Sequence, residues 1–175
     1  IYNTYMKNLE GKKALILGIA SNRSIAWGIS ESLKNNGAEL AFTYQNDKLK
    51  ERVEKLANEC GSNIVLPCDV SIDGSISKML EELSNHWKEF DILIHSLAFA
   101  PKEELEGNYV EKTTKDGFVQ AHSISSYSLL ELCKEAKPML KGSNPSVISL
   151  SYLGAETGCL LYTSPSPRYG LQSRI

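Results

Sequence analysis

The residues Gly18, Ser24 and Gly28 have the types and the spacing that suit a site for a phosphate group. Gly18 follows an apolar run and can take a backbone turn that a side chain would obstruct. Ser24 is placed to cap a helix whose free first-turn amides and dipole attract an anion. Gly28, one turn further on, is expected to let that helix pack closely against the strand. We therefore predict a strand, a phosphate-binding loop and a helix, with a plain turn and incidental glycines as the alternative.

Polar residues follow the next two predicted strands, where a dinucleotide site holds the adenosine. Gln45 comes after the strand 39–43, and Asp69 and Val70 come after the strand 63–67. Gln45 is neutral and has no arginine beside it to meet a 2′-phosphate, although Lys48 is close. This favours NADH over NADPH. Asp69 has a second possible role, as the cap of the following helix.

Strand-like and helix-like runs alternate along the chain in the order that these loops require. The apolar runs predict strands that are buried on both faces, at 13–17, 39–43, 63–67, 91–96 and 146–150. Helical spacing of apolar residues, including Ile25, Ile29 and Leu33 on one face, fills the intervals, and the last helix is expected to run from about 115 to 140. The pattern predicts an α/β fold with a doubly wound parallel sheet of the Rossmann type.

The periodic pattern stops after Glu156. The segment 157–175 has neither helical nor strand spacing and contains Pro165 and Pro167. A sheet of this kind should continue into another helix after the strand 146–150. We therefore expect a partial NAD-binding domain over 1–156, incomplete at its C-terminal side, and an unstructured or foreign tail over 157–175. A flexible native tail is the alternative.

The composition excludes several classes of partner. The hydrophobic content of 42%, the charged content of 23% and the net charge of −2 are ordinary for a globular protein and do not suggest nucleic acid. No apolar run approaches the roughly 20 residues of a membrane span. The 4 cysteines lack C-x-x-C spacing, which favours reduced thiols in a cytoplasmic protein over disulfides or a metal site. The three histidines are not assigned catalytic or metal-binding roles.

Several stretches together resemble one family, the enoyl-acyl carrier protein reductases of bacterial fatty-acid synthesis, a divergent branch of the short-chain dehydrogenases/reductases. The similarity runs from about Leu9 to Glu156. The stretches that carry it are Gly18–Ser21, Ser24–Gly28, Ala38–Gln45, Cys68–Val70, His95–Pro101 and Ser149–Glu156. The His95–Pro101 stretch is the most specific, because ordinary members of the superfamily have N-N-A-G there.

The resemblance implies a role for residues at each part of the site. Those implied to hold the cofactor are Gly18, Ser24 and Ile25 at the pyrophosphate, Gln45, Asp69 and Val70 around the adenosine, and Leu97 along its length. Ala100 would contact the substrate, and Tyr152 would be the first of two active-site tyrosines. Packing at the strand end is the alternative role for Tyr152.

The resemblance implies hydride transfer from NADH to a trans-2-enoyl thioester on acyl carrier protein, in a cytoplasmic homotetramer. Tyr162 follows Tyr152 by ten residues, as the second tyrosine of the family does, but the position of the family's lysine, seven residues later, holds Tyr169. No lysine follows Lys141. We retain Tyr162 as a candidate, favour coincidence for its spacing, and expect the 175-residue chain to lack enoyl reduction.

Two other functions fit parts of the pattern. One is a reductase of the same superfamily that acts on a carbonyl, against which the His95–Pro101 stretch argues. The other is a nucleotide-binding module without catalysis, which the missing lysine favours and the Ser149–Glu156 stretch opposes.

Overall fold

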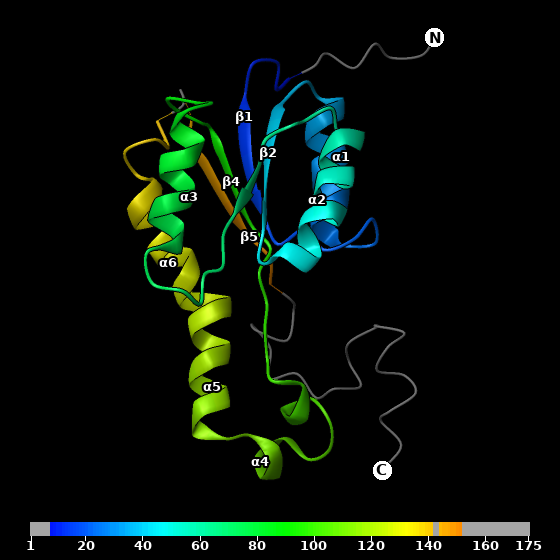
Figure 1. The fold of residues 1–175 in the computed structure, drawn as a ribbon, viewed down its shortest axis with the longest axis vertical. Helices are drawn as coiled ribbons and strands as arrows, with labels where there is room; N and C mark the ends of the chain where they lie inside the picture. The colour runs from blue at the N-terminus through cyan, green and yellow to red at the C-terminus, as the bar shows by residue number, and fades with distance from the viewer. Residues whose placement is uncertain (1–7, 142–143, 152–175) are drawn as a thin grey trace.

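The computed structural model describes residues 8–141 and 144–151, which form a parallel sheet between two layers of helices (Figure 1). The strands are β1 (Lys13–Leu17), β2 (Glu39–Tyr44), β3 (Val65–Pro67), β4 (Ile92–His95) and β5 (Ser146–Ser149). Their order across the sheet is β3-β2-β1-β4-β5, and every neighbouring pair is parallel. The predicted doubly wound sheet is confirmed, and its direction of winding reverses between β1 and β4.

The helices cover both faces of this sheet at β1, β2 and β4, whose residues are largely buried. The prediction that the last strand is buried on both faces is wrong for the described residues, because β5 lies at the edge of the sheet and its Val147 and Ile148 are 43% and 44% exposed. The helices α1 (Ile25–Asn35) and α2 (Asp47–Glu59) lie on one face, and α3 (Ser75–Ser84) and α6 (Ser128–Ala136) lie on the other (Figure 1). Successive residues of β1 enter opposite layers: Ile16 packs with the α1 and α2 side, whereas Leu15 packs with the α3 and α6 side. Each layer buries its own apolar cluster. Within the described residues, no helix is both long and apolar enough to cross a membrane.

The connection between β4 and α6 differs from the single long helix expected over 115–140. It contains η1 (Lys102–Glu104), α4 (Tyr109–Lys112), α5 (Lys115–His122) and η2 (Ser123–Tyr127), and η2 is a π-helical turn. Apolar periodicity does not detect the extra residue that such a turn inserts into a helix. The helix α6 then ends at Ala136.

The face predicted for α1 is confirmed at Ile29 and Leu33, which pack against the core cluster on that side of the sheet, but not at Ile25. Ile25 was expected to face the core but is 68% exposed, whereas Ala26 and Ser30 are buried. The Ser30 hydroxyl donates a hydrogen bond to the Ala26 carbonyl at 2.7 Å, so the polar group is satisfied inside the protein. The predicted packing role of Gly28 is wrong, because a Cβ atom there would meet nothing within 4 Å. Small residues, rather than the glycine, allow the close approach of α1.

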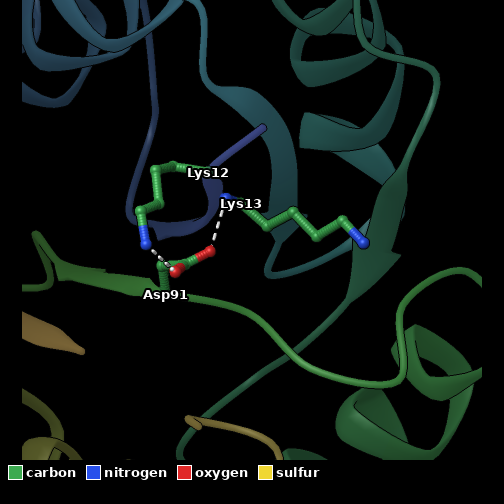
Figure 2. A network of polar contacts seen from close by, with 3 residues as sticks. All are labelled: Lys12, Lys13 and Asp91. Atoms are coloured by element: carbon green, nitrogen blue, oxygen red, sulfur yellow. Dashed lines mark hydrogen bonds and ion pairs between the residues drawn. The ribbon is translucent and has the colours of Figure 1, made fainter. Parts of the chain in front are cut away.

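An ion pair holds β1 and β4 together at the end of the sheet where both strands begin. Lys12 Nζ lies 2.6 Å from Asp91 Oδ1, and the Lys13 backbone N–H donates to Asp91 Oδ2 at 3.0 Å (Figure 2). The Lys13 side chain points away from the carboxylate (Figure 2). Burial acts to raise the pKa of Asp91, but the hydrogen bonds from Lys12 and Lys13 outweigh burial and lower it. Asp91 is therefore a carboxylate at neutral pH.

We expect Asp91→Asn to lower the free energy of unfolding by about 1–3 kcal/mol at pH 7, because it removes a largely buried charge that two donors stabilise. The pKa of Asp91 is lowered in the folded state, so its contribution exists above the ordinary value of 3.8 and is lost as the pH falls through the folded value. Urea unfolding at pH 7 and at pH 3 measures both effects. The control is Asp73→Asn, at an exposed position; equal losses in the two variants would contradict the prediction.

Candidate functional site

A cavity of about 200 Å³ lies at the carboxyl ends of the strands, where the winding of the sheet reverses. Open α/β sheets bind ligands in a crevice at this place. Its lining includes five residues that the sequence predicts for a cofactor site, namely Gly18, Gln45, Asp69, Val70 and Leu97. These residues come from the ends of four different strands, and the fold brings them together.

Gly18 occupies a position that excludes any other residue. Its φ is +92°, and a Cβ atom on it would lie 2.0 Å from the Ser96 carbonyl oxygen and 3.1 Å from Leu97 Cδ2. The Ser96 N–H donates to the Leu17 carbonyl at 3.0 Å, so the backbone after β4 is fixed against the end of β1. The glycine therefore lets the end of β1 and the backbone after β4 come together at the wall of the cavity.

Ser24 caps α1 as predicted. Its φ and ψ of −77° and 152° are extended, and its hydroxyl oxygen accepts a hydrogen bond from the Trp27 N–H at 3.2 Å. The same hydroxyl donates to the Ser21 carbonyl at 2.7 Å, which ties the loop to the helix. Ser24 and Ile25 are not among the residues that line the cavity. They form the N-terminal turn of α1, where the helix dipole favours an anion.

Gln45 and Asp69 meet across the ends of β2 and β3. Gln45 Nε2 donates to Asp69 Oδ2 at 3.1 Å, and the Ser71 N–H and hydroxyl donate to Asp69 Oδ1 at 2.9 and 2.6 Å. Burial acts to raise the pKa of Asp69, but these hydrogen bonds outweigh burial and lower it. The alternative role of Asp69 as the cap of α3 is not seen, because Gly74 is the N-cap residue. The carboxylate instead stabilises the turn at Ser71 and remains charged beside Gln45.

Other lining residues were not predicted. Tyr44 and Cys68 adjoin predicted site residues, so the positions of the strand ends could have indicated them. Burial raises the pKa of the Cys68 thiol to about 11, and Cys60, Cys68 and Cys133 are all free thiols. Ile124 comes from the π-helical turn η2, and no local pattern in the sequence places it at the cavity.

The described part of the chain leads toward the predicted tyrosines without including them. The Leu150 N–H donates to the His95 carbonyl at 3.3 Å, so the backbone after β5 leaves at the same edge of the sheet as the cavity. Tyr152 and Tyr162 lie outside the described residues, and their roles stay predictions. Ala100 is half-buried and follows the lining residues 96–99 without lining the cavity itself.

Comparison with known proteins places this arrangement in a family. The family model described as Enoyl-(Acyl carrier protein) reductase matches residues 18–166. The chain belongs to the enoyl-acyl carrier protein reductase family. It is 53% identical over 148 residues to the NADH enoyl-[acyl-carrier-protein] reductase FabI of Salmonella typhimurium, covering 85% of this chain and 56% of that relative. The corresponding Escherichia coli protein is 51% identical over the same length.

Solved structures of enoyl-acyl carrier protein reductases have the same fold. The NADH reductase from Aquifex aeolicus superposes with a TM-score of 0.82 at 47% identity, covering 86% of this chain and 60% of that one. The enzyme from Anaplasma phagocytophilum, solved in complex with NAD, gives 0.81 at 39% identity, covering 87% of this chain and 57% of that one. The chain thus spans about half the length of the curated relatives it matches.

Alanine substitutions at Gly18, in the site, and at Gly28, in α1, should change the stability of the protein in opposite directions. Gly18→Ala should lower the free energy of unfolding by about 2 kcal/mol or more, because it combines a positive φ with a backbone clash. Gly28→Ala should instead raise it by up to about 1 kcal/mol, because open space and a helical backbone favour alanine. Thermal unfolding measures both variants, and a Gly18→Ala protein as stable as the Gly28→Ala protein would contradict the geometry at Ser96.

Proposed function

We propose that the full-length protein containing this chain is an NADH-dependent enoyl-acyl carrier protein reductase of fatty-acid elongation. Its substrate is a trans-2-enoyl thioester on acyl carrier protein, and its product is the saturated acyl thioester. The observation that carries the proposal is the family match over residues 18–166, supported by relatives about half identical in sequence. The same match favours this reaction over carbonyl reduction and over a module without catalysis.

The geometry of the cavity fits a dinucleotide. Gly18 lines the cavity beside the loop that leads to α1, and the free amides at the N-terminal turn of that helix favour an anion such as a pyrophosphate. We assign the cofactor contacts by region: Gly18, Ser24 and Ile25 at the pyrophosphate, Gln45, Asp69 and Val70 at the adenosine, and Leu97 along the cofactor. NADH, when bound, supplies the hydride. Ala100 is assigned to the substrate side of the loop after β4.

The charge at the adenosine end supports NADH over NADPH. The Asp69 carboxylate accepts a hydrogen bond from Gln45 at 3.1 Å and stays ionised at neutral pH because its pKa is lowered. A 2′-phosphate placed near this pair would meet a negative charge. No arginine adjoins Gln45 in the sequence, where a site for a 2′-phosphate would place one.

Hydride addition to the β-carbon of an enoyl thioester places negative charge on the thioester oxygen. A phenol donor aimed at that oxygen stabilises the charge as it develops. We assign this role to Tyr152, with Tyr162 as the candidate second tyrosine. A phenol with an ordinary pKa near ~10 is protonated at neutral pH and remains a donor.

The assembly proposed for the full-length protein is a cytoplasmic homotetramer. Support comes from apolar side chains that remain exposed along the helical segment from α5 to α6, where an isolated subunit would leave them in water. Those side chains are Phe118, Val119, Tyr127 and Leu130, each at least 46% exposed.

The preference for NADH should depend on Asp69. We expect Asp69→Asn to reduce the ratio of NADPH to NADH dissociation constants by about threefold to tenfold, because it removes a charge that repels the 2′-phosphate. Fluorescence titration of the full-length protein with each cofactor measures the ratio. The control is Asp116→Asn, an exposed residue of α5. An unchanged ratio in Asp69→Asn would argue against the carboxylate as the source of selectivity.

The catalytic proposal predicts a loss confined to turnover. In the full-length protein, Tyr152→Phe should lower kcat for crotonyl thioester reduction by about 10²–10³-fold, because the donor to the developing oxyanion is lost. The dissociation constant for NADH should change by less than about twofold. The control is Tyr109→Phe, at a 65% exposed position. NADH oxidation followed by absorbance tests this, and a wild-type protein that reduces ketones but not enoyl thioesters would refute the proposed function.

A further inference from the structure

The π-helical turn η2 links the cavity to the loop after β4 through side chains. In this turn the Ser128 N–H bonds to the Ser123 carbonyl, five residues back, instead of to the carbonyl four residues back. Turns of this kind are rare and frequently lie at functional sites. Three inward residues belong to the turn or follow it directly: Ile124 lines the cavity, and Ser125 and Ser128 make hydrogen bonds to the β4 region.

One end of the turn is anchored in the core. The Ser128 hydroxyl donates to the Ile124 carbonyl at 2.6 Å, so its oxygen must accept from His95 Nε2, which lies 2.8 Å away. His95 therefore carries its proton on Nε2, and its Nδ1 can accept from the Ser149 hydroxyl at 3.3 Å. Both His95 and Ser128 are buried. Burial lowers the pKa of His95, which agrees with a neutral ring held between two hydroxyls.

The middle residue of the turn, Ser125, holds the loop. The Phe99 N–H donates to Ser125 Oγ at 3.0 Å, and the Ser125 hydroxyl donates to the Phe99 carbonyl at 3.2 Å. The Ser125 hydroxyl thus bonds to both the N–H and the carbonyl of Phe99. Two hydrogen bonds fix the orientation of the Phe99 backbone better than one. Phe99 lies beyond the end of β4, where the strand ladder no longer constrains the backbone. Phe99 itself lines the cavity.

We propose that Ser125 is a positioning residue, whose hydroxyl holds the Phe99 backbone and thereby sets the loop 98–101 on the substrate side of the cavity. The two hydrogen bonds between Ser125 and Phe99, here called the clamp, are independent of the proposed function. Only the kinetic effect expected from them rests on the proposed function. The His95–Ser128 contact keeps the turn fixed against β4, so that Ser125 acts from a rigid support.

The loop has separate supports on its two sides. Ser96 is held by β1, through its N–H bond to the Leu17 carbonyl, so the segment at Leu97 keeps its position when Ser125 is changed. Residues 98–101, which include Ala100, depend on the contact between Phe99 and Ser125. Loss of the hydroxyl should therefore disturb the substrate side more than the cofactor side.

The test uses the full-length protein and three variants. Ser125→Ala removes the clamp, Ser125→Thr keeps a hydroxyl, and Ser126→Ala changes the exposed neighbour in the same turn. Hydrogen–deuterium exchange on peptides covering 97–101 reports the clamp directly. We expect exchange there to be about tenfold faster in Ser125→Ala, as the loss of a hydrogen bond of ordinary strength implies. Ser125→Thr and Ser126→Ala should match the wild type.

Kinetics supply the second readout. The KM for the enoyl thioester should rise about threefold to tenfold in Ser125→Ala, while the NADH dissociation constant changes by less than about twofold, and Ser125→Thr should restore the wild-type KM. Unchanged exchange at 97–101 in Ser125→Ala would overturn the proposal. Faster exchange throughout the sheet, with weaker NADH binding, would also overturn it, because the serine would then have only a structural role. A wild-type protein without enoyl reduction would refute the proposed function, while the exchange data would still decide whether the clamp exists.

Discussion

The close approach of β1 and β4 at Gly18 and Ser96 is the constraint on which the candidate site depends. A Cβ atom at Gly18 would lie 2.0 Å from the Ser96 carbonyl oxygen, so the two strand ends can meet only around a glycine. Their meeting places the loop before α1 beside the loop after β4, at the point where the winding of the sheet reverses. The cavity exists because helices leave this point in opposite directions and neither covers it.

The same pair of strands is fixed at its other end by Lys12 and Asp91. The ion pair at 2.6 Å and the backbone bond from Lys13 hold the start of β1 against the start of β4. Between these two ends the backbone hydrogen bonds of the parallel ladder set the separation of the strands, and their buried apolar side chains pack against the helices on both faces. The carboxyl edge can therefore carry polar side chains without weakening the core, and the ionised Asp69 lies there.

Local residue patterns predicted most of the sheet and part of the site. Continuous apolar runs located the strands, and the chemical types of Gly18 and Ser24 predicted a turn and a helix cap that the structure confirms. The errors have a common origin, because they concern how a helix is rotated or interrupted. Ile25 was placed inward and Gly28 was given a packing role, although the fully buried residues of α1 are Ala26 and Ser30, beside the correctly predicted Ile29 and Leu33. The sizes of the side chains on both sides of the helix–sheet interface decide which side of α1 faces the sheet. The apolar pattern of the helix alone does not contain the sizes of its partners on the sheet.

The walls of the cavity differ in what holds them. Most lining residues lie at strand ends or in the loops that follow them, where parallel pairing brings the loops to one edge and a local pattern suffices to find them. The remaining wall contains Phe99 and Ile124 and depends on side-chain hydrogen bonds between residues that are 26 and 33 positions apart, from Ser125 to Phe99 and from His95 to Ser128. The periodicity of apolar residues cannot reveal such contacts. They join a loop to a π-helical turn, and that turn interrupts the regular spacing of the helix in which it lies. Because Phe99 lies beyond the strand ladder, the position of this wall depends on the hydrogen bonds from Ser125, whereas Gly18 and Asp69 are placed by the ends of β1 and β3.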